Sequence, residues 1–263
     1  MIKILAVILF FLVIIIGEER GVNSILSLIG NIFVILASIY AMTNGYNPIM
    51  VSIAATVILA AIILFGQNGV NEKNKTSFVS VLIVIVLMIS ASCIVGNRTS
   101  VSGYNDLDVY EEDAMYLSTD INVNMTDVQI ALIIFGILGA IVDTSIAIST
   151  SVYEVHRNNE NLTAAELFKS GIVMGKDIIG TTANTLLFTC IGESMMMFML
   201  FKNFNYSFEK IINSKAMFQQ FIFTIFGGLG CVIIIPITAV LISNNLKKKS
   251  SRLPRKFIRR NES

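Results

Sequence analysis

The sequence contains few charged residues for its length. Of 263 residues, 54% are hydrophobic and 14% are charged, whereas soluble domains average about 25% charged. The longest polar stretch, about residues 96–127, is too short to form a sizeable core of its own. Tryptophan is absent, and the three cysteines lie in or beside apolar runs, so structural disulfides are not expected. These deficits exclude a soluble globular protein and indicate an integral membrane protein.

Motifs of the common enzyme families are also missing. The sequence has no H-E-x-x-H, no G-x-S-x-G and no P-loop. Its single histidine, His156, has no visible partner set for acid–base catalysis. We therefore expect no enzymatic activity, no cofactor, no resident metal and no nucleic-acid partner.

Long apolar runs dominate the rest of the chain. A membrane-spanning helix needs about 20 apolar residues, with a range of roughly 17–25. The runs that meet this criterion, with a short first one that contains Lys3, are 2–17, 24–43, 48–66, 77–95, 128–152, 181–201 and 217–242. The predicted fold is all-α: a polytopic membrane helix bundle of about seven transmembrane helices in contact with the lipid bilayer, plus one amphipathic interfacial helix.

Acidic and basic residues are separated along the chain. The 96–127 loop is rich in Asp and Glu, and residues 247–263 are rich in Lys and Arg. A cytoplasmic C-terminus places fourteen of the nineteen lysines and arginines inside, as the positive-inside rule favours. We expect a transmembrane domain over 1–246, an extracytoplasmic acidic loop, and a basic cytoplasmic tail that contacts anionic lipid head groups.

The segment before the sixth span has a local signal of its own. Thr163-Ala-Ala-Glu166 is a capping-box pattern that starts a helix, and the residues after it are amphipathic. The glycines of this segment are Gly171, Gly175 and Gly180. We predict a helix over 163–174 on the inner surface and a kink within 175–180. The alternative is a plain loop in which the glycines ease a tight turn.

The fifth span carries one carboxylate among small residues. They recur at intervals of three or four residues, which places them on one helix face: Gly136, Ala140, Asp143, Ala147 and Thr150 or Ser151. Small residues allow a neighbouring helix to approach closely. A carboxylate at the bilayer centre costs roughly 2.5–3.5 kcal/mol on insertion scales, so Asp143 is expected to point into the bundle.

The sixth span carries a second polar stripe. Its candidate site residues are Asp177, Thr181, Asn184, Thr185 and Glu193. Hydroxyl, amide and carboxylate oxygens can bind a cation, relay protons or hold a polar solute in a hydrated cavity. The alternative is that these groups only form hydrogen bonds between packed helices, worth about 0.6–2 kcal/mol each.

Several stretches resemble the YibE/F family of bacterial membrane proteins. They are Gly136-Ile-Leu-Gly-Ala-Ile-Val-Asp143 with Ile148–Glu154 after it, Gly171-x-x-x-Gly-Lys-Asp-Ile-Ile-Gly-Thr-Thr-Ala-Asn-Thr185, Arg20–Ser24, Gly45–Pro48 and Ile235–Ala239. The size resembles the shorter, YibF-like branch. The resemblance implies a multi-pass protein of the bacterial plasma membrane, often encoded beside a paralogue, with no established activity. Of the candidate residues, Glu193 alone departs from the family motif.

Two functional hypotheses follow. The first is transport of a small solute or ion through a polar site between the fifth and sixth spans, with Asp143 and Asn184 coordinating and Asp177 near the inner gate. The alternative is a non-transporting membrane subunit that assembles with a paralogous YibE-like partner. A buried, hydrated cavity around Asp143 would favour transport, and a dry seam would favour assembly.

Overall fold

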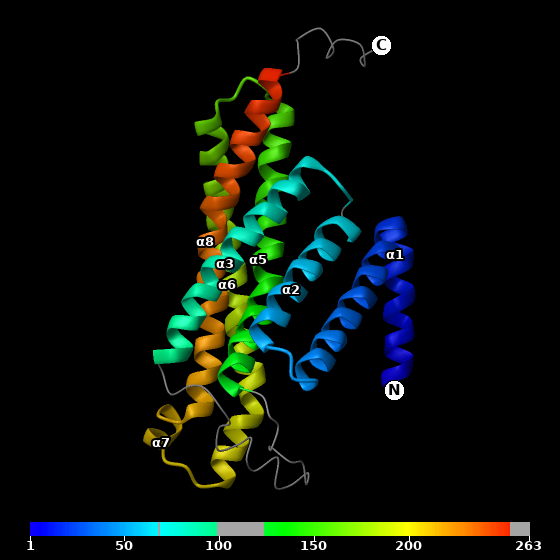
Figure 1. The fold of residues 1–263 in the computed structure, drawn as a ribbon. Helices are drawn as coiled ribbons and strands as arrows, with labels where there is room; N and C mark the ends of the chain where they lie inside the picture. Colours follow the sequence, from blue (N-terminus) through cyan, green and yellow to red (C-terminus); the bar gives the residue numbers. More distant parts are fainter. Residues whose placement is uncertain (68, 99–123, 253–263) are drawn as a thin grey trace.

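The computed structural model describes residues 1–67, 69–98 and 124–252, and this part of the chain is helical without strands (Figure 1). The elements are α1 (Ile2–Thr43), α2 (Pro48–Ala61), the π-helix η1 (Ile62–Gln67), α3 (Glu72–Arg98), α5 (Met125–Asn158), α6 (Ala164–Asn203), α7 (Phe208–Ile212) and α8 (Lys215–Arg252). Within the described residues, six helical stretches are long and apolar enough to cross a membrane. The prediction of an all-α, polytopic membrane protein is therefore confirmed. Most of the acidic loop and the end of the basic tail lie outside the described residues.

The first two predicted spans both fall within α1, which is sharply broken at Glu18. Glu18 has φ 48° and ψ −130°, which is not a helical conformation. Residues before the break turn back beside the residues after it (Figure 1). Gly21 permits this reversal because a Cβ there would collide with the backbone carbonyl of Val13. The stretch Lys3–Thr43 thus forms two antiparallel segments, 2–17 and 24–43, within one candidate span.

The break in α1 predicts that substitutions at Glu18 and at Gly21 change the stability of the fold in opposite directions. Glu18→Gly is expected to stabilise the fold by up to about 1 kcal/mol, because glycine adopts positive φ without strain. Gly21→Ala is expected to destabilise it, because the added Cβ meets the backbone at Val13 and cannot be relieved by a side-chain rotation. Thermal unfolding of both variants in the same detergent checks the signs. Equal shifts in the same direction would contradict the described turn.

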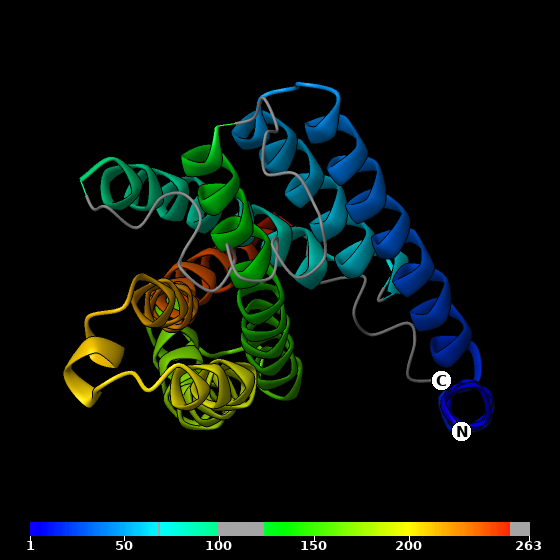
Figure 2. The same cartoon turned by 90° about the horizontal axis from the view of Figure 1, so that it is seen from below.

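Helices α3, α5 and α8 form the centre of the bundle, and α6 lies against it from outside. The core contains fully buried side chains from all three central helices, such as Val84, Ile141 and Ile234. Asn245 of α8 donates a hydrogen bond to Thr76 of α3, which joins the start of α3 to the end of α8. Figure 2 shows α5, α6 and α8 grouped together, with α1 and α2 to one side. Many side chains of α6 that face away from α5 and α8 are exposed in the described part of the chain.

Helix α6 begins as predicted but continues without the predicted break. The capping box is present: Thr163 N donates to Glu166 Oε2 at 2.7 Å, and Glu166 N donates to Thr163 Oγ1 at 3.3 Å. The helix then runs for 40 residues to Asn203. The predictions of a separate interfacial helix over 163–174 and of a kink within 175–180 are wrong, as is the alternative of a plain loop. Two of the three glycines bring α6 close to α8: a Cβ at Gly171 would lie 2.8 Å from Ala239 Cβ, and one at Gly175 would collide with Ile235.

Candidate functional site

The predicted site residues lie on the outer surface of the single chain. Asp143 of α5 is exposed, and so are Asp177, Thr181, Asn184, Thr185 and Glu193 of α6. The expectation that Asp143 points into the bundle is wrong within this chain. Successive helix residues are separated by about 100°. The face opposite Asp143 carries Ile141, Ser145 and Ile148, which are fully buried and occupy the interior.

Contacts between the helices place Asp143 and the start of the α6 stripe at the same depth. A Cβ at Gly171 would lie 2.8 Å from Ala239 Cβ of α8 and 3.0 Å from Val152 Cγ2 of α5, so these three positions are level. Helices α5 and α6 run in opposite directions (Figure 1). Asp143 lies nine residues before Val152, and Gly180 lies nine residues after Gly171, so both are about 14 Å from that level at 1.5 Å per residue. Thr181 is about 15 Å and Asn184 about 20 Å from the same level, so Asp143, Thr181 and Asn184 lie within about 6 Å of one another in depth.

That depth is near the middle of the apolar length of the bundle. Along α5, Asp143 is about 24 Å from Asp127 and about 17 Å from Glu154, the next charged residues on either side. Since the hydrocarbon core of a bilayer is about 30 Å thick, Asp143 lies deep within it when the ends of α5 reach the two surfaces.

The polar side chains at this depth retain unused hydrogen-bonding capacity. Thr181 Oγ1 donates to Ile178 O at 2.9 Å, and Thr185 Oγ1 donates to Thr181 O at 3.0 Å, so both hydroxyl oxygens can still accept. Within the described part of the chain, Asp143 and Asn184 have no hydrogen-bond partner. With Asp177, which is also exposed, the arrangement offers two carboxylates, an amide and two hydroxyls to whatever covers α5 and α6. We call the set Asp143, Asp177, Thr181, Asn184 and Thr185 the polar face.

Glu193 does not belong to this face. Gln220 Nε2 of α8 donates a hydrogen bond to Glu193 Oε2 at 2.6 Å. Glu193 is twelve residues beyond Thr181, which places it about 18 Å nearer the other end of α6. The structure thus joins Glu193 to the packing of α6 against α8.

The polar contacts that join the central helices come from residues that the sequence reasoning did not select. Ser77 Oγ of α3 and Ser149 Oγ of α5 share a hydrogen bond at 2.6 Å. Ser145 Oγ of α5 and Thr238 Oγ1 of α8 share another at 3.1 Å. All four side chains are buried. The signal was present in the i, i+4 spacing of Ser145 and Ser149, which lie on the α5 face opposite Asp143.

The Ser77–Ser149 pair allows a quantitative prediction. Hydrogen bonds between transmembrane helices are worth about 0.6 kcal/mol on average and up to about 1.7 kcal/mol. We expect the variants Ser77→Ala and Ser149→Ala, with their combination, to give a coupling free energy in that range. Reversible unfolding in bicelles measures it. Strictly additive losses would mean that the two hydroxyls do not interact.

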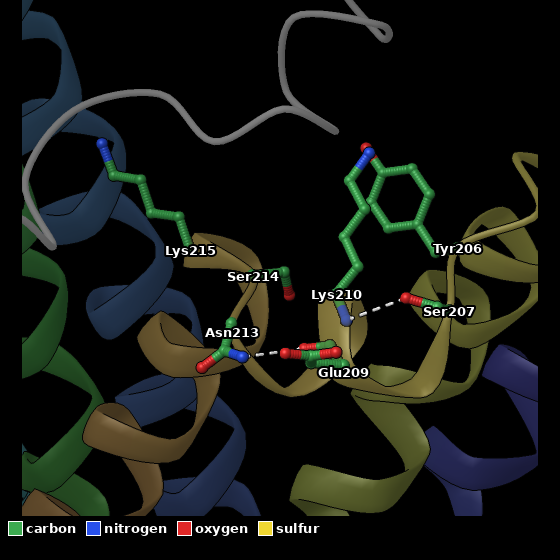
Figure 3. Close-up of a pocket in the computed structure, with 7 residues that line it drawn as sticks. All are labelled: Tyr206, Ser207, Glu209, Lys210, Asn213, Ser214 and Lys215. Atoms are coloured by element: carbon green, nitrogen blue, oxygen red, sulfur yellow. Dashed lines mark hydrogen bonds between the residues drawn. The ribbon is translucent and has the colours of Figure 1, made fainter.

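Two pockets lie away from the polar face. One, of about 580 Å³, is formed by residues 206–215 around α7 (Figure 3). There the Nζ atom of Lys210 lies 3.8 Å from the centre of the Tyr206 ring, and Asn213 Nδ2 donates to Glu209 O. The other, of about 600 Å³, is an apolar groove between the second half of α1 and the start of α5, lined by residues such as Ile39 and Phe135. Neither pocket includes Asp143.

Metal ions in proteins are held by sets of side-chain ligands, commonly His, Cys, Asp and Glu. The described residues contain no group of three or more His, Cys, Asp or Glu side chains that could hold a metal ion. The cysteines Cys93, Cys190 and Cys231 are free thiols. The polar face instead presents oxygen and amide groups suited to hydrogen bonding.

The comparisons with known proteins bear on the chain as a whole. No curated protein and no solved structure matches it. The model of the YibE/F-like protein family matches residues 5–248, which covers both helices of the polar face and the central bundle. The resemblance found in the motifs of α5 and α6 therefore extends over most of the chain, and this multi-pass membrane protein belongs to the YibE/F-like family.

Proposed function

We propose that this chain is a subunit of a membrane assembly in which a second membrane protein covers the polar face of α5 and α6. The observation that supports this most is Asp143, an exposed carboxylate near mid-depth without a hydrogen-bond partner in the described chain. Facing lipid, it would cost roughly 2.5–3.5 kcal/mol or more. A second polypeptide that supplies hydrogen-bond donors removes this cost.

The assembly is tested by the composition of the protein in its native lipids. The wild-type chain, of 28.9 kDa, is extracted into polymer-bounded nanodiscs without detergent and its mass and polypeptides are determined. We expect a particle that contains at least one further membrane polypeptide in fixed stoichiometry. Particles that contain one copy of this chain and no other polypeptide would refute the proposal.

Transport is the second candidate function, and one observation favours it. Asp143, Thr181 and Asn184 lie within about 6 Å of one another in depth on the neighbouring helices α5 and α6. Once covered, such a set can hold a small polar solute or ion or relay protons. Proteoliposomes loaded with a pH-sensitive dye test the proton case, with Asp143→Asn as the variant. If transport needs the negative charge of Asp143, Asp143→Asn should lose proton flux while its expression stays unchanged. Equal flux from the variant and the wild type would argue against a site at Asp143.

The orientation that we propose is a cytoplasmic C-terminus in the bacterial plasma membrane. Its support is the excess of basic residues at the end of the bundle that carries Arg157, Lys169 and Lys247. Single cysteines at Asn159 and Ser207, in the connections before and after α6, check it in a cysteine-free background. In intact cells, a membrane-impermeant maleimide is expected to label Ser207→Cys and to spare Asn159→Cys. Equal labelling of both would contradict this topology.

A further inference from the structure

We infer that the protein covering the polar face is a second copy of this chain, docked face to face about a two-fold axis along the membrane normal. This inference rests on the proposed function and adds the identity and orientation of the partner. It places Asp143 of each copy against Thr181 and Asn184 of the other.

The glycines separate into two groups by what surrounds them. Gly136, Gly175 and Gly230 are packed inside the chain, because a Cβ at each would collide with Phe223, Ile235 and Ile141 respectively. Gly139 of α5 and Gly180 of α6 have nothing within 4 Å of an added Cβ. Internal packing therefore does not require glycine at these two positions. They lie one turn from Asp143 and beside Thr181, where they leave room for another helix to approach closely.

The depths of the polar groups suit a copy in the same orientation. A two-fold axis along the membrane normal keeps every residue at its own depth. Residues of the two copies therefore face each other across the interface when their depths are similar. The acceptor Asp143 and the donors Asn184 and Thr181 lie within about 6 Å of one another in depth, and all three side chains are exposed. Each copy can therefore supply the donors that the carboxylate of the other lacks.

The charges on α6 are complementary under the same symmetry. Lys176 and Asp177 are adjacent and both exposed, so they differ in depth by about 1.5 Å. Lys176 of one copy can therefore approach Asp177 of the other. Opposite charges in one surface patch favour association of the patch with itself, whereas a patch of one sign would repel its copy.

Cross-linking between two tagged forms of the full chain tests the docking. In a background with Cys93, Cys190 and Cys231 replaced by alanine, one form carries Gly139→Cys and the other carries Asn184→Cys. They are co-expressed and oxidised in native membranes. We expect a disulfide-linked species with both tags, at least tenfold more abundant than with Val86→Cys, an exposed position on α3, in place of Gly139→Cys. Absence of this excess would overturn the assigned face.

A packing variant tests the interface without disturbing the fold. Gly180→Leu adds a side chain where the chain leaves open space, so thermal unfolding of the single chain should stay unchanged while the cross-linked yield falls at least tenfold. An undiminished yield would contradict close docking at Gly180. The nanodisc composition distinguishes the proposed assembly from the proposed identity of its partner. Nanodiscs with two identical chains support both proposals. Nanodiscs with a different membrane polypeptide overturn only the inference of a second copy, and nanodiscs with one chain alone overturn both.

Discussion

Replacement of Gly175 by leucine is expected to prevent α6 from packing against α8 and to remove most of the correctly folded protein. The side chain of Ile235 occupies the position that a Cβ at Gly175 would take. The buried residues of α6 are few: Leu167, Gly171, Gly175, Cys190, Ser194 and Phe201. Overpacking typically costs about 1–3 kcal/mol, and the backbone of α6 would have to move to relieve it.

The matched control for this variant lies on the same helix. Gly192 is exposed and has nothing within 4 Å of an added Cβ, so Gly192→Leu should fold normally. The yield of monodisperse protein and its thermal unfolding temperature compare the two. If Gly175→Leu is as stable as Gly192→Leu, then the close approach of α6 to α8 is not as described.

Replacement of Asp143 by leucine is expected to weaken assembly without lowering the stability of the single chain. Removing an unpartnered carboxylate from the outer face of α5 should leave the single chain as stable as before, or more stable, because the interior does not use it. It should lower the assembled fraction about tenfold or more, because each interface loses hydrogen bonds worth about 0.6–1.7 kcal/mol.

Asparagine at the same position distinguishes the two proposed functions. Asp143→Asn keeps an acceptor oxygen and should retain most of the assembly. A transport site that depends on the negative charge should lose its activity in the same variant. The two effects are compared on one preparation, with assembly measured by cross-linking and flux measured in proteoliposomes. Assembly of Asp143→Leu equal to that of the wild type would exclude pairing of Asp143 across an interface.

The all-α membrane fold was predictable because it depends on the length and polarity of the apolar runs. The capping box at Thr163 and Glu166 was predictable for a similar reason, since it is a local pattern of four residues. The continuation of α6 through Gly171 and Gly175 was not. Glycine serves equally at a break and at a close helix contact, and only the position of Ile235 and Ala239 on α8 decides between the two.

The direction in which Asp143 points could not be read from its own helix. Helix α5 has small or hydroxyl residues on two opposite faces, one with Asp143 and one with Ser145 and Ser149. The expectation of an inward carboxylate assumed that a single chain must bury it. In the structure the serines meet Ser77 and Thr238, and the acidic face stays uncovered. The free-energy cost of placing Asp143 in lipid still applies, and in our proposal a second chain removes it.

A structure of the protein in a lipid nanodisc, obtained without detergent, tests the central claim most directly. The measurement is the distance from the carboxylate of Asp143 to the nearest polar atom of another polypeptide. Our account predicts a hydrogen-bond distance, at most about 3.2 Å, to a side chain of a second membrane protein that covers the polar face. Lipid acyl chains packed against Asp143, with no second polypeptide on α5 and α6, would contradict it.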